Sequence, residues 1–203
     1  VVVSGSQQAA AFQQMQDFLG KELSMSMSAN GTIIASQKEG VKLSRAGRKA
    51  MKAFGSATIT VNIVAENTKE TSSGNLYVGG AFMGNTVNAD GTVTARQEVN
   101  PEVLGAMSNA YGKPGQDMMH EVTEAYQGAL ISQRSGVSSP ISNQPGSVYP
   151  DAHNIAIPQS GIVKEHYYNS AGKKVQTLSP AVVRSTYTVY PRRQQPVVIM
   201  RFP

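Results

Sequence analysis

The chain contains no cysteine among its 203 residues. Disulfide bonds, thiol nucleophiles and zinc sites built on cysteine are therefore excluded, although this absence does not fix the cellular compartment. Long apolar runs are also missing, because no stretch approaches the roughly 18 residues that a membrane span requires. We therefore expect a protein without a membrane-spanning segment.

Other sequence signals are absent as well. The chain has no glycine-rich phosphate loop and no nucleophile elbow, which disfavours phosphoryl transfer and serine hydrolysis. It also has no signal peptide, since Val1-Val2-Val3 lacks a preceding basic region and is typical of a strand. Such a start is compatible with a processed or excised piece of a longer protein.

Acidic residues are outnumbered by basic ones, with 13 Asp and Glu against 18 Lys and Arg and a net charge of +5. Basic residues gather around one expected helix, on which Arg45, Lys49 and Lys52 form a stripe. The basic residues of this region are Lys38, Lys42, Arg45, Arg48, Lys49 and Lys52. No aromatic residues are interleaved with them and no groove-reading motif is present. We therefore expect a solvated basic face and no nucleic-acid partner. Nucleic-acid binding is kept as an alternative to the functions considered below.

Hydrophobic periodicity divides the first two thirds of the chain into short elements. A first helix carries Phe12, Met15 and Leu19 and is expected to be capped by Ser4 or Ser6. Period-two alternation predicts a hairpin over 23–35, a strand over 57–65 and two further strands over 76–87 and 92–99. Between them, Ser44 is expected to cap a second helix that ends at Phe54 and Gly55, and a short helix should begin at Pro101.

Residues 115–130 then predict a longer helix that carries chemistry. At 3.6 residues per turn, His120 and Glu124 share one face, and Glu121 lies about 100° round from His120. Met119 and Val122 begin an apolar stripe on a different face, so one face is expected to be core and the other a site. The alternative is an ordinary surface helix with a polar face.

This helix resembles the active-site helix of zincins, the zinc metallopeptidases with a His-Glu-x-x-His motif. In that motif both histidines bind zinc and the glutamate is the general base for the metal-bound water. The resemblance implies that His120 is a metal ligand, that Glu121 is the base and that Glu124 stands in the place of the second histidine. Carboxylate oxygen is an accepted zinc ligand, although the departure at Glu124 puts metal identity and activity in question.

A catalytic zinc needs one more protein ligand. His153 follows a Gly/Ser/Pro-rich loop that can redirect the backbone, whereas His166 lies in an expected strand. We favour His153, with His166 as the alternative and Asp151 and Glu165 as weaker candidates. A nearby phenolic hydroxyl could also stabilise an oxyanion. The tyrosines of this region are Tyr149, Tyr167, Tyr168, Tyr187 and Tyr190.

The order of elements also resembles a zincin, in which a twisted sheet backed by helices precedes the active-site helix and an edge strand binds extended substrate. We therefore expect a single α+β, zincin-like domain over 1–203, with a sheet-and-helix part over 1–132 and an irregular, loop-rich part over 133–203. The strand around Gly80, Ala81 and Phe82 is expected to bind substrate.

The function that this resemblance implies is zinc-dependent hydrolysis of peptide bonds in a protein or peptide substrate. A catalytically inactive zincin-like binding module is the alternative. The chain is also similar to metallopeptidase-type domains of larger bacterial secreted or toxin-like proteins. That similarity implies a secreted or cell-surface location as part of a larger or processed protein.

Overall fold

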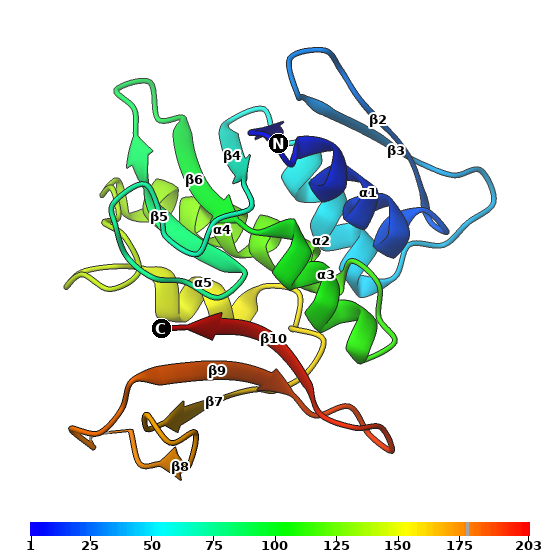
Figure 1. The fold of residues 1–203 in the computed structure, drawn as a ribbon. Helices are drawn as coiled ribbons and strands as arrows, with labels where there is room; N and C mark the ends of the chain where they lie inside the picture. The colour runs from blue at the N-terminus through cyan, green and yellow to red at the C-terminus, as the bar shows by residue number, and fades with distance from the viewer. Residues whose placement is uncertain (178) are drawn as a thin grey trace.

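The computed structural model describes residues 1–177 and 179–203. Two sheets lie on opposite sides of the molecule, with helices between and around them (Figure 1). The helices are α1 (Gln8–Leu19), α2 (Arg45–Phe54), α3 (Pro101–Ala110), α4 (Gln116–Ser135) and α5 (Tyr149–Ile155). Within the described residues, no helix is both long and apolar enough to cross a membrane.

The upper sheet of Figure 1 has the strand order β1, β4, β6, β5. Its strands are β1 (Val2–Ser4), β4 (Ile59–Ala65), β6 (Val93–Val99) and β5 (Gly80–Val87). β1, β4 and β6 are parallel, and β5 runs antiparallel to β6 at one edge. A separate hairpin pairs β2 (Leu23–Met27) with β3 (Ile33–Gln37). The expected mixed α+β architecture is therefore present.

Helix α4 lies at the centre of the fold. It packs against the sheet through β4, β5 and β6 and against α1, α2, α3 and α5 on its other sides. Gly115 and Gly136 flank it with φ of +72° and +70°, left-handed values that glycine adopts without steric cost. Because neighbours surround α4, both its apolar stripe and its polar face are buried. The surface-helix alternative is therefore wrong.

The C-terminal part is more regular than expected. A lower sheet has the order β10, β9, β7, β8. Its strands are β10 (Val197–Phe202), β9 (Arg184–Val189), β7 (Val163–Tyr168) and β8 (Lys174–Val175). These strands are short and partly exposed, so their apolar alternation is weak, and antiparallel pairing with distant segments defines them instead. The strand expected at His166 is therefore present as β7, and the part expected to be irregular also contains a regular antiparallel sheet.

Of the two helix N-caps expected from the sequence, one was confirmed and one was wrong. Ser44 caps α2 as expected, with its hydroxyl accepting a hydrogen bond from the Gly47 amide at 3.0 Å. The cap expected for α1 was wrong, since Gln7 occupies that position without a side-chain bond. Ser6 instead bonds to the carboxylate of Glu66, 60 residues further along the chain. A tertiary contact has replaced the local one.

Candidate metal centre

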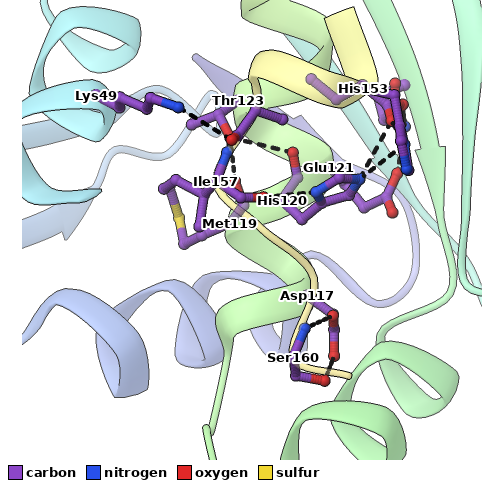
Figure 2. Close-up of polar contacts among 12 residues, drawn as sticks. Lys49, Asp117, Met119, His120, Glu121, Thr123, His153, Ile157 and Ser160 are labelled. Atoms are coloured by element: carbon purple, nitrogen blue, oxygen red, sulfur yellow. Dashed lines mark hydrogen bonds and ion pairs between the residues drawn. The ribbon is translucent and has the colours of Figure 1, made fainter. Parts of the chain in front are cut away.

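Three side chains from two helices form one cluster, and Figure 2 shows two of them, His120 and His153, turned towards one another. α4 supplies His120 and Glu124 one turn apart, and α5 supplies His153. His120 Nε2 lies 3.1 Å from His153 Nδ1 and 3.3 Å from Glu124 Oε2. His153 Nδ1 lies 2.7 Å from the same oxygen. The fold thus brings together the three residues that the sequence indicated as ligands.

Their spacing suits a metal ion. In a tetrahedral zinc site with bonds of about 2.0 to 2.1 Å, neighbouring donor atoms lie roughly 3.3 Å apart. The separations of 3.1 and 3.3 Å match this value, and the third, 2.7 Å, is that of a hydrogen bond. Two imidazoles and one carboxylate form a donor set that catalytic zinc uses, with one position left for water. His120, Glu124 and His153 could therefore hold a metal ion.

The orientation of His120 is fixed from behind. Its Nδ1 lies 2.6 Å from the carbonyl oxygen of Ile157. A carbonyl oxygen only accepts hydrogen bonds, so Nδ1 must carry the proton, and in the neutral ring Nε2 then presents a lone pair to the cluster. Metal-binding histidines commonly have such a partner on the second ring nitrogen. The tautomer required for binding through Nε2 is therefore imposed by the backbone.

Residues 155–160, here called the strap, carry the Ile157 carbonyl along α4. Thr123 Oγ1 accepts a hydrogen bond from the Ile157 amide at 2.9 Å. The buried Asp117 carboxylate accepts one from the Ser160 amide at 2.7 Å and another from the Ser160 hydroxyl. Figure 2 shows both anchors, one on each side of the imidazole. The strap is thus held at two points of the helix that carries His120 and Glu124.

A third anchor comes from α2. Lys49 Nζ donates hydrogen bonds to the strap carbonyls of Ile155 and of Ala156, the latter at 3.0 Å. Lys49 belongs to the basic stripe on α2, so one ammonium group of that stripe is hydrogen-bonded within the fold. Lys49 and Arg45 also line a cavity of about 510 Å³ behind the strap, which His120, Glu124 and His153 do not line. The cavity is therefore separate from the metal cluster.

Gln97 on β6 links the two carboxylates of the site. Its Nε2 donates to Glu124 Oε1 at 3.1 Å and also to Glu121 Oε2. By holding Oε1, Gln97 leaves Oε2 of Glu124 directed at the histidines. Gln97 was not among the residues expected at the site. The signal was its place among inward-facing apolar residues such as Ala95 and Val99, because a buried amide needs polar partners.

The electrostatics of the cluster favour positive charge. Burial lowers the pKa of His120, but the hydrogen bond to Glu124 and the charge of Glu121 outweigh it and raise that pKa to about 9. Burial and the charge of Glu124 raise the pKa of Glu121 to about 8. Burial also acts to raise the pKa of Glu124, yet hydrogen bonds from His120 and His153 hold it below its ordinary value. A cation among these groups would satisfy the same carboxylates.

Glu121 points from α4 towards the edge strand. Its carboxylate is so close to Gly80 that a Cβ at that position would overlap it. The Asn100 amide donates to the Gly79 carbonyl at 2.7 Å, so Gly79 faces β6 and the next residue faces away from it. The backbone N–H and C=O of Gly80 are therefore directed to the open edge, and the carboxylate of the expected base lies against the same residue.

The three residues expected to bind substrate, Gly80, Ala81 and Phe82, differ in how accessible they are. Gly80, Ala81, Phe82 and Tyr149 are part of the lining of a groove of about 240 Å³. The Phe82 ring is fully buried and packs against Gly128 and Tyr149, so it forms a wall and has little surface for contact with a bound chain. Gly80 and Ala81 are half-buried on the strand and remain accessible.

The alternative ligands lie elsewhere. His166 is on β7 in the lower sheet, where its Nε2 is hydrogen-bonded to the Tyr190 hydroxyl. Glu165 accepts a hydrogen bond from Tyr167 at 2.6 Å. Neither residue belongs to the three-residue cluster, and nor does Asp151. The geometry therefore agrees with the preference for His153 over His166.

Comparison with known proteins does not assign the chain to a family. A scan against models of protein families, a search of curated proteins and a search of solved structures each found no match to the chain. The resemblance to zincins consequently rests on the motif and on the arrangement of the elements around it. Its functional implications remain predictions.

Proposed function

We propose that this protein is a zinc-dependent hydrolase of peptide bonds. His120, Glu124 and His153 hold the zinc ion, and Glu121 is the general base. Support comes chiefly from one observation: three donor atoms of a catalytic zinc set lie within 4.8 Å of one another, with the tautomer of His120 already fixed. A structural zinc site would more often use four protein ligands, whereas three leave room for water.

A bound zinc would supply Lewis acidity to the attacking water and to the substrate carbonyl. Glu121 accepts a proton from the water and passes it to the leaving amine. Gln97 keeps the Glu121 carboxylate in place through its amide, and the closeness of Gly80 sets the carboxylate below the open edge of β5. An extended substrate pairs with that edge, which brings its carbonyl near the base.

Tyr149 is the tyrosine that adjoins the cluster. Its ring centroid lies 5.4 Å from that of His153. Burial and the charges of Glu124 and Glu121 raise the pKa of Tyr149 to about 12, so its hydroxyl keeps its proton at neutral pH. We assign to this hydroxyl the donation of a hydrogen bond to the carbonyl oxygen as negative charge develops there.

The decisive experiment replaces Glu121 by glutamine. Glu121→Gln keeps the shape of the side chain but removes its ability to accept a proton. We expect hydrolysis of an unfolded protein substrate to fall by about 100- to 10,000-fold while bound zinc stays stoichiometric. Zinc is measured by elemental analysis and hydrolysis by release of new amino termini.

The matched control is Glu165→Gln, which makes the same change beside His166. This variant should cleave at the wild-type rate. Equal activity of the wild type and Glu121→Gln would remove Glu121 from the mechanism. Stoichiometric zinc without any hydrolysis would favour the alternative, an inactive binding module on the same fold.

A further inference from the structure

The groove beside β5 borders the proposed catalytic site. Tyr149 and Gly80 line it, the first with its ring beside His153 and the second against the Glu121 carboxylate. Its volume of about 240 Å³ is below the roughly 300 to 1,000 Å³ of pockets that hold whole small molecules. The groove is therefore of a size for part of a chain, and it begins next to the base.

The walls of the groove are uncharged and mix polar with apolar side chains. The polar ones include Thr71, Asn75, Ser142 and Asn143. The apolar ones come from three segments. Leu76 and Val78 come from the segment before β5, Ala81 and Met83 from the strand, and Ile141 from the segment after α4. Among the described residues, no charged side chain lines it. Leu76 is 60% exposed at the rim, although it is a large aliphatic residue. A ligand that covers this wall would remove apolar surface from water.

The backbone limits where a substrate can lie. Gly80 offers an unpaired edge, but the Phe82 carbonyl already accepts a hydrogen bond from the Ser142 amide at 3.1 Å. Ser139 pairs with Asn85 further along the same edge. Strand addition is therefore possible only at the start of β5, beside the groove. A peptide paired there would direct a side chain close to the scissile bond into the groove.

We propose that the groove selects one uncharged, apolar side chain adjacent to the peptide bond that is cleaved. This specificity rests on the proposed peptidase function. An aliphatic or aromatic side chain gains free energy by burial against Leu76, Ala81 and Ile141. A charged side chain would lose hydration against these uncharged walls. The preferred substrates are thus unfolded or extended segments with an exposed apolar residue.

A binding experiment tests the groove apart from catalysis. Three fluorescein-labelled Gly/Ser peptides differ only in a central leucine, glutamate or lysine. Their affinity for the Glu121→Gln chain with added zinc is measured by fluorescence anisotropy. We expect the leucine peptide to bind about tenfold more tightly or better than the other two, the scale set by burial of one aliphatic side chain. Equal binding of all three would overturn the proposal.

A charge placed in the groove sharpens the test. Ile141→Lys should reverse the preference and favour the glutamate peptide, and Ala81→Lys provides a second variant on the strand in case the first folds poorly. Ile34→Lys is the control, because Ile34 is 59% exposed on the separate hairpin. A preference that neither groove variant changes would place the binding site elsewhere.

Mapping of cleavage sites separates this proposal from the proposed function. Wild-type chain with zinc is incubated with a peptide library from a digested proteome, and new termini are sequenced by mass spectrometry. Cleavage next to apolar residues, with charged residues depleted, supports the groove assignment. Cleavage without preference would overturn the groove while the peptidase stands. Binding of the leucine peptide without any cleavage would support the groove assignment and overturn the proposed peptidase function.

Discussion

Two histidines in this chain each have a carboxylate and a tyrosine as neighbours, yet their surroundings differ. His153 is partly exposed and contacts the buried Glu124 on α4 and Tyr149 on its own helix, α5. His166 lies in the lower sheet with a hydrogen bond to Tyr190 and with Glu165 next in sequence. Only the first belongs to a cluster of converging donor atoms. The same residue types therefore make a site only where packing directs them at one point.

Partners behind the ligands account for much of this difference. The Ile157 carbonyl orients His120 and the Gln97 amide orients Glu124. Burial of these groups makes each unpaired polar atom costly, so the arrangement is strongly defined. In the lower sheet, by contrast, His166 and Tyr190 are accessible and can change partners with water. The region in which buried polar groups hydrogen-bond to one another is the one in which we expect mutations to have large effects.

The largest difference in zinc affinity between the two regions should appear when each histidine is replaced by alanine in turn. His153→Ala removes one of three ligands, and we expect zinc affinity to fall by more than about 100-fold, the upper range for loss of a supporting partner alone. His166→Ala should bind zinc as the wild type does. Affinity is measured by competition with a chromophoric chelator. A larger loss for His166→Ala would make the lower sheet the metal-binding region.

A smaller effect is expected at the buried polar residues of the two sheets. Gln97→Leu leaves the buried oxygens of Glu121 and Glu124 without a donor, which should weaken zinc binding by about 10- to 100-fold. Thr186→Val in the lower sheet is the counterpart, because Thr186 Oγ1 is buried without a partner among the described residues. That change should be neutral or slightly stabilising in urea unfolding. A loss of zinc affinity in Thr186→Val as large as that in Gln97→Leu would end the distinction between the two regions.

The strap provides a finer test of the buried region. Thr123→Val removes the acceptor of the Ile157 amide and loosens the carbonyl that fixes His120. Zinc affinity should fall about tenfold. The Nδ1–H signal of His120 should also broaden in nitrogen-15 spectra of the metal-free chain. Thr123→Ser keeps a hydroxyl and should restore both properties, whereas an equal loss in both variants would point to packing alone.

The smallest effect concerns the pH dependence of the lower sheet. Burial, with the charges of Lys174 and Lys164, lowers the pKa of His166. The unfolded chain then binds more protons than the folded one, so the free energy of unfolding should decrease slightly as pH falls through the ordinary histidine pKa of about 6.5. His166→Gln should flatten this part of the curve in urea titrations from pH 8 to pH 5. A steeper decrease in the variant would reverse the sign.

The sequence by itself determined features that depend on neighbours along the chain. Helical periodicity was sufficient to place His120 and Glu124 on one face, because 3.6 residues per turn fixes that relation within any helix. The Ser44 cap followed from its position before α2, and the alternation of β4 followed from its β-branched residues. The turn-rich segment after α4 also indicated that His153 could be redirected inward.

Tertiary structure decided the features that join distant segments. His153 lies 29 residues from Glu124, Ile157 lies 37 from His120, and Gln97 lies 24 from Glu121. Periodicity within one element carries no information about such pairs, since packing of α4 between the sheet and its surrounding helices sets their relative positions. The same packing buried α4 on all sides, and pairing of short, partly exposed strands made the lower sheet. The sequence therefore named the three residues of the cluster, and the fold supplied the groups that hold them in place.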